Sequence, residues 1–413
     1  MSRPPLRVAV LGAGTVGRPV AAAFETMPER LAPADGAALV LAGIAVRDVE
    51  RARERGLAAD LLTDAPAHLV ASPEIDVVVE LLGGDEPART LIAAALGAGK
   101  PVVTANKHVL AHHGPALEAI ARRVGVPLRF EAAVGGGIPV LGPLAAELAA
   151  NRIESIRGIV NGTTNVILSD MAERGRAYAD ALAAAQRAGY AEADPSGDVD
   201  GDDAVNKLVI LARLAFGVWL EPASVERHPP TVSGRGQPGI SGVRADEVAA
   251  ATAHGLVLRL LACARRGLAD EVVASVLPTA VPAPSSFGRT SGVLNRIEIN
   301  GSPVGQVAFV GPGAGGRPTA SAVLGDLIAV ARSDASTWAG LAPALGPAVP
   351  AAIDQRPRRR FFASTLPDQL VRDQVDIEVA RAGGFIATAQ PLDELRTALA
   401  AAGVDATLYP IDE

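Results

Sequence analysis

A glycine-rich loop near the start of the chain constrains the fold more than any other feature. Gly12, Gly14 and Gly17 match the pattern G-x-G-x-x-G, after a β-branched apolar run at residues 6–11 and before an alanine-rich helical stretch at 18–25. Glycines in this setting permit a tight turn and close backbone approach, and the helix N-terminus favours a pyrophosphate. A ligand-free turn is the alternative. The loop predicts dinucleotide contacts at Gly12, Ala13, Gly14, Thr15, Val16 and Gly17.

The segments after this loop alternate between strand and helix. Apolar runs at residues 39–46, 76–81 and 101–104 have the composition of buried strands, and helix-like stretches such as 88–98 separate them. This alternation predicts a parallel sheet with right-handed crossovers. We therefore expect an α/β fold with a Rossmann-type dinucleotide-binding domain over residues 1–132.

The alternation of strand-like and helix-like segments ends after Phe130. A glycine-rich loop at 134–139 is followed by a predicted helix at 141–150 and a predicted strand at 153–160. We expect an α+β domain for substrate binding and dimerisation here, over residues 133–310.

A second glycine-rich segment lies far from the first. Residues 311–316 precede a helical stretch at 319–331, and we expect residues 311–335 to complete the dinucleotide-binding domain. A cluster of Pro and Gly over 342–357 is typical of a linker.

The last part of the chain, residues 355–413, predicts a small ferredoxin-like unit, because its segments follow the order strand, helix, strand, strand, helix, strand. The expected elements are residues 360–364, 368–373, 375–380, 385–390, 392–402 and 405–409.

Composition argues against several kinds of partner. The formal net charge of −7 is spread along the chain, so there is no basic stripe to neutralise a nucleic-acid backbone. No segment reaches the roughly 18 uninterrupted apolar residues of a membrane span. The single cysteine, Cys263, fits a reducing compartment, and its apolar neighbourhood at 256–264 predicts a core position on a helix. We expect a cytoplasmic protein with a small-molecule substrate and neither nucleic-acid nor membrane partners.

The end of the second predicted strand carries both residue types that distinguish nicotinamide cofactors. An acidic residue there, such as Asp48, accepts the ribose hydroxyl of NAD, and an arginine, such as Arg47, pairs with the 2′-phosphate of NADP. Because Arg47 comes first and offers bidentate phosphate contacts, the pair favours NADP and leaves NAD open.

An acidic segment ahead of an apolar helix contains the strongest candidate for proton transfer. Lys207 follows Asp203 by one helical turn on the same face, with apolar residues at 208–216 beyond it. A lysine held away from water is costly unless paired, and it suits proton transfer to a carbonyl oxygen. Spacing alone leaves catalysis and a structural ion pair both open.

Together these segments resemble the homoserine dehydrogenase family over most of residues 6–335. Thr104-Ala105-Asn106-Lys107 resembles the family's T-x-N-K segment. The stretch that begins Asn161-Gly162-Thr163-Thr164-Asn165 resembles its substrate-pocket signature, and the likeness continues through residues 185–201. The segment 311–316 resembles its returning glycine loop.

The resemblance implies interconversion of L-homoserine and L-aspartate 4-semialdehyde, a step in threonine and methionine biosynthesis, with Lys207 as the acid/base and Lys107 as a second candidate. The implied substrate contacts are Thr163, Glu192, Asp198 and Asp203. Further implied cofactor contacts are Lys107, Gly189 and Gly315.

The resemblance also implies a bound monovalent cation, usually sodium, and a homodimer. The cation would be held largely by backbone carbonyls, and the implied ligands are Glu131, Val134, Gly136 and Ile138.

Two other functions are weighed against this one. Aspartate semialdehyde dehydrogenase needs a cysteine nucleophile, which the predicted core position of Cys263 does not supply. A non-catalytic regulator that senses NADP or an amino acid is the second. The strand and helix order of 355–413 resembles an ACT regulatory domain, although Leu366-Pro367-Asp368-Gln369 replaces the usual D-x-P-G turn. The set of Glu192, Asp203 and Lys207 favours the enzyme.

Overall fold

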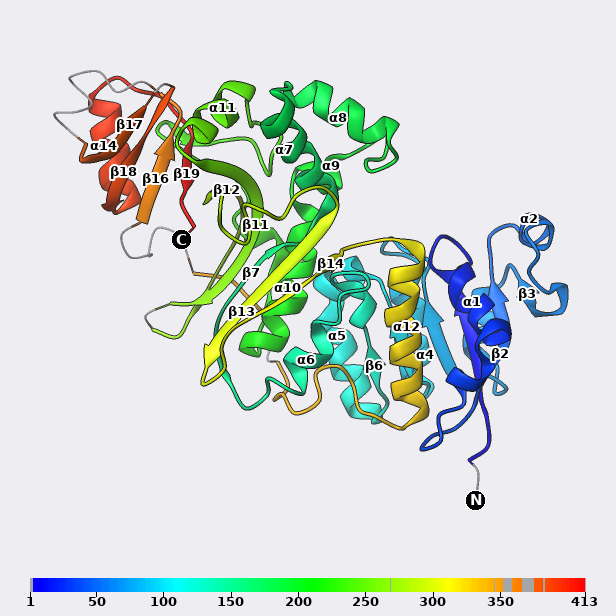
Figure 1. Ribbon diagram of the computed structural model, residues 1–413. Helices are drawn as coiled ribbons and strands as arrows, with labels where there is room; N and C mark the ends of the chain where they lie inside the picture. Colours follow the sequence, from blue (N-terminus) through cyan, green and yellow to red (C-terminus); the bar gives the residue numbers. More distant parts are fainter. Residues whose placement is uncertain are drawn as a thin grey trace. The chain divides into compact units, whose positions relative to one another are not determined.

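A computed structural model of the chain describes residues 3–267, 269–344, 346–351, 359–365, 375–381 and 383–412. The chain divides into two compact units (Figure 1). The first consists of Met1–Arg152, Val209–Pro222 and Gly311–Ala348, and the second of Ile153–Leu208, Ala223–Val310 and Val349–Glu413. Residues 133–152 and 209–222 thus lie in the first unit, outside the range predicted for the dinucleotide-binding domain.

The first unit is built on a six-stranded sheet with the order β3-β2-β1-β4-β5-β6. Every neighbouring pair is parallel, and this is the strand order of the Rossmann fold, as predicted. The strands are β1 (Leu6–Leu11), β2 (Leu39–Ala45), β3 (Leu62–Thr63), β4 (Val77–Glu80), β5 (Val102–Thr104) and β6 (Leu128–Arg129).

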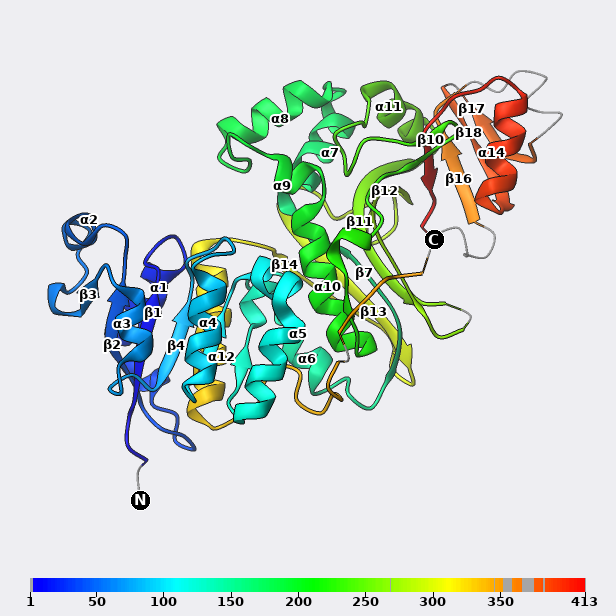
Figure 2. The same ribbon diagram turned by 180° about the vertical axis from the view of Figure 1, so that it is seen from behind.

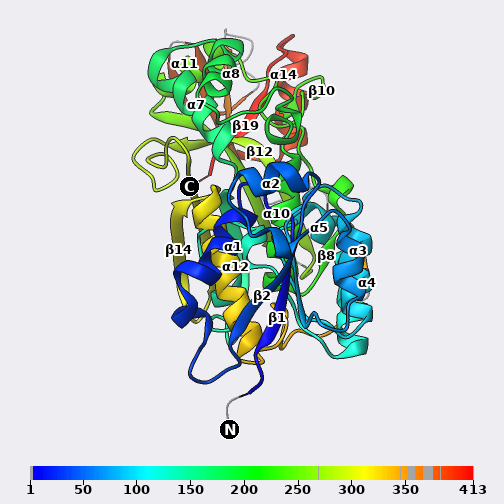
Figure 3. The ribbon, with the colours of Figure 1, turned by 90° about the vertical axis from the view of Figure 1, so that its right-hand side faces the viewer.

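Helices cover both faces of this sheet. Figure 3 shows α1 (Gly17–Thr26) and α12 (Gly316–Ala331) on one face, with α3 (Pro66–Ala71) and α4 (Ala88–Gly97) on the other, where α5 (Lys107–Val124) also lies. The valines of β1 and β4 and the apolar face of α12 are buried in one core. The segment after residue 310 thus supplies a helix to the dinucleotide-binding fold.

Shorter elements complete the first unit. The helix expected at 141–150 is only α6 (Leu141–Ala145), and β8 (Trp219–Leu220) pairs with β15 (Pro347–Ala348) in parallel. The others are α2 (Val49–Glu54) and the 3-10 turns Pro28–Leu31, Ala59–Leu61, Glu131–Ala133 and Pro222–Ser224, of which the last reaches the second unit.

The second unit contains a five-stranded sheet with the order β12-β11-β7-β13-β14. Its strands are β7 (Arg152–Ile159), β11 (Leu256–Arg266), β12 (Val272–Pro282), β13 (Leu294–Ser302) and β14 (Gly305–Pro312). The helix predicted around Cys263 is wrong, because this run is strand β11. Neighbouring positions of β11 are buried on both faces, which removes the alternation that identifies a strand.

Helices and a small hairpin surround this sheet. They are α7 (Gly162–Arg174), α8 (Tyr178–Arg187), α9 (Ser196–Val199), α11 (Ala245–Ala253), β9 (Pro230–Thr231), β10 (Gly234–Arg235) and the first half of α10 (Asp202–Phe216), whose residues from Val209 onward belong to the first unit. None of the helices in the described ranges is long and apolar enough to cross a membrane.

The end of the chain forms a four-stranded antiparallel sheet with the order β17-β18-β16-β19. Figure 2 shows α14 (Leu392–Ala401) beside it. The helix predicted at 368–373 and the segment 366–369 lie outside the described residues, so an ACT-like unit stays a prediction. The strands are β16 (Arg359–Ala363), β17 (Ile377–Arg381), β18 (Gly384–Gln390) and β19 (Leu408–Pro410).

Candidate active site

The glycine-rich loop turns between β1 and α1. Gly12 has a φ of +102°, and a Cβ there would lie 2.7 Å from the backbone oxygen of Leu81. A Cβ on Gly17 would lie 1.8 Å from the backbone oxygen of Gly12, whereas a Cβ on Gly14 would meet nothing within 4 Å. The fold therefore requires two of the glycines, and the third leaves the open space that a pyrophosphate needs at a helix N-terminus.

The second glycine loop packs against the first within the same unit. Gly315 is the N-cap of α12 and has a φ of +125°, while a Cβ on Gly316 would lie 2.4 Å from the backbone oxygen of Thr15. The first turns of α1 and α12 are thus neighbours at the carboxyl edge of the sheet. Two helix N-termini together favour an anionic ligand there.

A cavity of about 230 Å³ lies between the glycine loop and the end of β2. The carboxylate of Asp48 lines it and also caps α2 by accepting the N–H of Arg51 at 2.9 Å. None of the lining arginines has an ion-pair partner among the described residues. This excess of unpaired cations favours a ligand with several negative charges. The arginines are Arg18, Arg47, Arg51 and Arg55.

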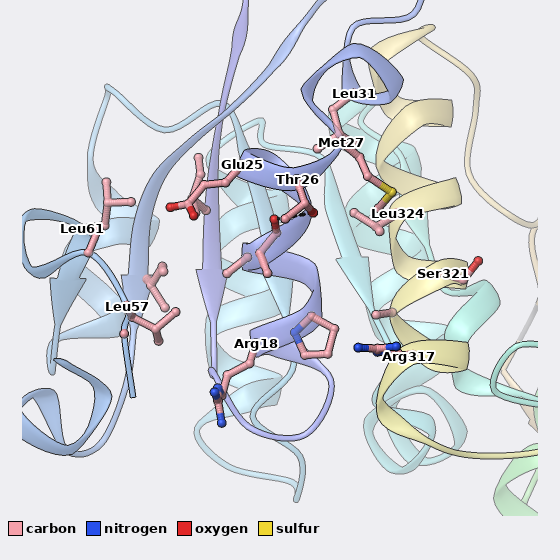
Figure 4. A pocket seen from close by; sticks show the side chains of 18 of the residues that line it. Arg18, Glu25, Thr26, Met27, Leu31, Leu57, Leu61, Arg317, Ser321 and Leu324 are labelled. Carbon is pink, nitrogen blue, oxygen red and sulfur yellow. Dashed lines mark hydrogen bonds between the residues drawn. The ribbon is translucent and has the colours of Figure 1, made fainter. Parts of the chain in front are cut away.

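A larger hollow of about 1230 Å³ continues from this cavity along α1. Arg18 and Arg55 line both spaces. Figure 4 shows Arg18 of α1 and Arg317 of α12 facing the hollow, each from the first turn of its helix. Positive charge therefore flanks the glycine loop on a second side.

The T-x-N-K segment follows β5 at the same edge of the sheet. The hydroxyl of Thr104 donates to Glu80 at 2.6 Å, and burial raises the pKa of that carboxyl. Asn106 caps α5 with its side-chain oxygen, and its amide donates to the carbonyl of Gly84 at 2.9 Å. These bonds fix the position of Lys107, the first residue of α5, at the strand ends where ligands of this fold bind.

In the second unit, α10 holds a buried ion pair. The Nζ of Lys207 donates to Asp203 at 2.7 Å and to the carbonyl of Val160 at 2.6 Å. Lys207 is 7% exposed and Asp203 9%. The one-turn spacing in the sequence predicts this pair. An amine so placed has fixed geometry and is shielded from bulk water.

Asn161 connects this pair to a second carboxylate. Its side-chain oxygen caps α7, which leaves its amide to donate to Asp203 at 2.8 Å and to Asp198 at 2.7 Å. The sequence shows only that Asn161 precedes a helix, where an asparagine is an ordinary cap. The family signature was the only signal in the sequence for this second role.

Two further predicted substrate residues, Thr163 and Glu192, and the predicted cofactor contact Gly189 also lie in the second unit. The hydroxyl of Thr163 donates to the carbonyl of Tyr190 at 2.8 Å, and Gly189 has a φ of +76° just after α8. Glu192 is exposed, and its backbone oxygen accepts from Gln186 at 3.0 Å. Its carboxylate is thus on the surface, whereas Asp198 and Asp203 are held by Asn161.

The predicted cation loop is a tight turn in the first unit. The carboxylate of Glu131 accepts backbone N–H groups at the start of α6, from Val140 at 2.7 Å and Gly142 at 2.6 Å, and burial raises its pKa. Val134 and Ile138 are buried. The described residues contain no group of three or more His, Cys, Asp or Glu side chains arranged for a metal.

Fold and site together define a class of protein. A parallel sheet in Rossmann order carries a glycine loop flanked by arginines, and the chain also carries a buried lysine held by a carboxylate. This combination is that of an oxidoreductase that uses a nicotinamide dinucleotide.

Comparison with known proteins narrows the class. Residues 139–328 match the family model "Homoserine dehydrogenase", and residues 12–131 match "Homoserine dehydrogenase, NAD binding domain". The chain is 43% identical to the homoserine dehydrogenase of Corynebacterium glutamicum over 330 residues, 79% of this chain and 72% of that protein. It is 44% identical to that of Mycobacterium tuberculosis over 333 residues, 80% of this chain and 73% of the relative. The chain belongs to the homoserine dehydrogenase family.

Solved structures agree with this assignment. The homoserine dehydrogenase of Thiobacillus denitrificans superposes with a TM-score of 0.88 at 33% identity and covers 100% of both chains. A hyperthermophilic archaeal homoserine dehydrogenase in complex with NADPH has a TM-score of 0.65 at 29% identity, over 79% of this chain and 97% of that one.

Proposed function

We propose that this protein interconverts L-homoserine and L-aspartate 4-semialdehyde with NADP and that Lys207 transfers the proton. The single observation that carries the proposal is the buried bond between Lys207 and Asp203 at 2.7 Å in a chain of this family. A nicotinamide dinucleotide held by the glycine loop would supply the acceptor for the hydride that leaves the carbinol carbon of homoserine. The neutral amine of Lys207 takes the hydroxyl proton, and in the reverse direction the charged amine returns it.

The surrounding carboxylates are proposed to position both the lysine and the substrate. Asp203 holds the amine of Lys207, and together with Asp198 and Glu192 it offers negative charge to the ammonium group of homoserine. Thr163 is the proposed neutral contact. Asn161 keeps Asp198 and Asp203 in place through bonds of 2.7 and 2.8 Å.

Lys107 is the second candidate for the proton. It is proposed to contact the cofactor, because it begins α5 at the strand ends and its neighbour Asn106 is fixed by the cap. An amine at that position stabilises negative charge that develops on a substrate oxygen.

The cofactor preference is proposed to be for NADP over NAD. Support comes from Arg47 and three further arginines around the cavity at the end of β2, none of which has an ion-pair partner in the part of the chain that the structure describes, and from Asp48, which already caps α2. The diphosphate is proposed to contact the glycine loop, with Gly315 on one side.

A sodium ion is proposed to bind in the loop after β6. The oxygen-only donor set suits a hard monovalent cation, and the buried turn with Gly135 and Gly136 at φ values of +74° and +58° supports it. The ligands would be the carbonyl oxygens of Glu131, Val134, Gly136 and Ile138. The role of the ion would be structural.

A homodimer in the cytoplasm is the proposed working form. Strand β14 lies at the edge of its five-stranded sheet and none of its residues is buried. An exposed edge strand presents unpaired N–H and C=O groups with which another chain can pair, and a second copy of the chain is the proposed partner. The single cysteine fits a reducing compartment.

Turnover separates this proposal from the sensing regulator. The purified protein is mixed with homoserine and either NADP⁺ or NAD⁺ at alkaline pH, and the reduced cofactor is followed by absorbance. The proposal predicts that the cofactor is reduced when homoserine is present and that kcat/KM is higher for NADP⁺ than for NAD⁺. Thermal stabilisation by NADP⁺ without any turnover would favour the sensor.

A further inference from the structure

Glu80, at the end of β4, is a fully buried carboxylate that the proposed reaction does not use. Its exposed fraction is 0%, and a glutamate is almost never buried to this extent unless its carboxylate is paired or hydrogen-bonded. One oxygen accepts the N–H of Leu82 at 2.7 Å and that of Gly83 at 3.4 Å, and the other accepts the hydroxyl of Thr104 at 2.6 Å. Three donors from two segments of the chain therefore meet at this one side chain.

These donors follow or end two neighbouring strands. Glu80 and Thr104 are the last residues of β4 and β5 and are partners in the parallel pairing of the two strands. The hydroxyl of Thr104 also accepts the N–H of Asn106 at 3.0 Å, and the amide of Asn106 donates to the carbonyl of Gly84 at 2.9 Å. The hydrogen bonds thus form a closed ring, in which Glu80 joins the loop after β4 to the T-x-N-K segment and Asn106 joins them a second time.

The place of this ring in the fold indicates what it can hold. In a doubly wound sheet, the half that begins with the glycine loop takes the adenosine end of a dinucleotide, and the second half takes the nicotinamide end across the point where the strand order reverses. Here that point lies between β1 and β4, where Leu11 pairs with Glu80. A Cβ on Gly12 would lie 2.7 Å from the backbone oxygen of Leu81, so the loop after β4 contacts the glycine loop. The ring therefore lies in the nicotinamide half.

We propose that Glu80 is a positioning residue for the nicotinamide end of the cofactor. The inference rests on the proposed use of NADP. Glu80 holds the loop after β4 and the T-x-N-K segment at one fixed separation, and through Thr104 and Asn106 it sets where α5 begins and where its first residue, Lys107, is placed. A carboxylate suits this task because each of its oxygens accepts from a different segment, whereas an amide side chain has only one accepting oxygen.

The test compares the binding of NADP⁺ with that of adenosine 2′,5′-bisphosphate, which has the adenosine end and lacks the nicotinamide end. Both are measured by isothermal titration calorimetry. Thr104→Val keeps the shape of the side chain and removes the hydroxyl that joins β5 to Glu80. It should raise the Kd of NADP⁺ by about tenfold, as expected for loss of a hydrogen bond to a charged group, and leave the Kd of the bisphosphate unchanged. Thr104→Ser, which keeps the hydroxyl, should recover most of the lost affinity.

Turnover and a matched control separate positioning from a merely structural role. At saturating NADP⁺, Thr104→Val should also lower kcat for homoserine oxidation by about tenfold, because small misplacements of reacting groups slow the chemical step. Thr63→Val makes the same substitution at the end of β3, in the adenosine half, where the hydroxyl accepts the N–H of Ala65 at 3.1 Å. This control should leave the Kd of NADP⁺ and kcat near their wild-type values even if it lowers Tm.

Glu80→Gln is a second variant in case Thr104→Val does not fold, and it should weaken NADP⁺ while sparing the bisphosphate. The proposal is overturned if the folded Thr104→Val variant binds NADP⁺ as tightly as Thr104→Ser, or if its affinities for NADP⁺ and the bisphosphate fall by the same factor. The proposed function fails in a different way. Wild-type protein that binds NADP⁺ without oxidising homoserine would refute that function, and the binding comparison would still decide the role of Glu80. Wild-type protein that binds neither ligand would overturn both.

Discussion

Asp48 illustrates how the role of one residue depends on its local structure. In the sequence it follows a strand, where an acidic side chain normally accepts a ribose hydroxyl. In the structure its carboxylate caps α2, and the arginines around it have no ion-pair partner in the described ranges. The sequence therefore identifies Arg47 and Asp48 as candidate cofactor contacts. It does not show that Asp48 is used to cap α2, because that role depends on where α2 begins.

Replacement of Arg47 tests the cofactor preference. Arg47→Ala should raise the KM for NADP⁺ by about tenfold or more, because a charge-assisted bond to phosphate contributes about 1.5–3 kcal/mol. The KM for NAD⁺ should change little. Arg53→Ala is the matched control, since Arg53 is paired with Glu50 on α2 and does not line the cavity. Equal effects on both cofactors would contradict the assignment.

Among the elements, α5 and α10 are joined by a buried cluster that the sequence does not reveal. The carboxylate of Glu118 accepts from Arg213 at 2.6 Å and from the indole of Trp219 at 2.7 Å, and Arg213 is 0% exposed. A glutamate and an arginine about one hundred residues apart give no sequence signal of contact. Strands β1, β2, β4 and β5 of the Rossmann sheet were predictable because each is a short apolar run, whereas β3 and β6 have only two residues each and were not predicted. The helix predicted at β11 is wrong because that strand is buried on both faces.

Removal of Glu118 should destabilise the protein strongly. Glu118→Ala leaves Arg213 buried without its carboxylate, and we expect the free energy of unfolding to fall by about 3–5 kcal/mol. Glu50→Ala breaks an exposed pair on α2 and should cost about 1 kcal/mol or less. Chemical denaturation of both variants measures the difference. If the two variants lost similar amounts of unfolding free energy, burial of the Glu118 pair would not explain its contribution.

The same cluster should give a defined pH dependence. Burial by itself raises the pKa of Glu118, but the bonds from Arg213, Trp219 and Arg122 outweigh it and hold the pKa below its ordinary value of 4.5. Stabilisation is then present above the pKa of the unfolded state and is lost as pH falls through the lower folded pKa. The difference in Tm between wild type and Glu118→Gln should be large at neutral pH and shrink below about pH 4. A difference in Tm that does not change with pH would contradict the assignment of this stabilisation to the ionised carboxylate of Glu118.

For the whole molecule, the Rossmann order and the return of residues 311–335 to that fold could be predicted from glycine spacing and strand–helix alternation. The strand pairing of the second unit was harder to predict, because its long antiparallel strands join residues far apart in sequence, such as Cys263 of β11 and Arg157 of β7. In the candidate site, the pair of Lys207 and Asp203 followed from spacing. The part played by Asn161 required the folded geometry.

The exposed edge strand leads to a prediction about assembly. Sedimentation equilibrium should give twice the mass of one chain. Val310 is 51% exposed on β14, and Val310→Lys should weaken the dimer, because a charged side chain on an edge strand opposes pairing. Lysine at exposed Val40, on β2 of the first unit, is the control. A wild-type monomer at micromolar concentration would contradict the prediction.

The most direct test of the central claim compares Lys207→Ala with Lys107→Ala in homoserine oxidation. Lys100→Met, at a buried lysine that donates to the carbonyls of Val70 and Ser72, controls for loss of a buried amine. Loss of the proton-transfer group should lower kcat by about 10²–10⁴-fold. The account predicts this fall in Lys207→Ala, with NADP⁺ binding retained. Near-normal turnover in Lys207→Ala, with the fall in Lys107→Ala instead, would contradict it and exchange the two roles.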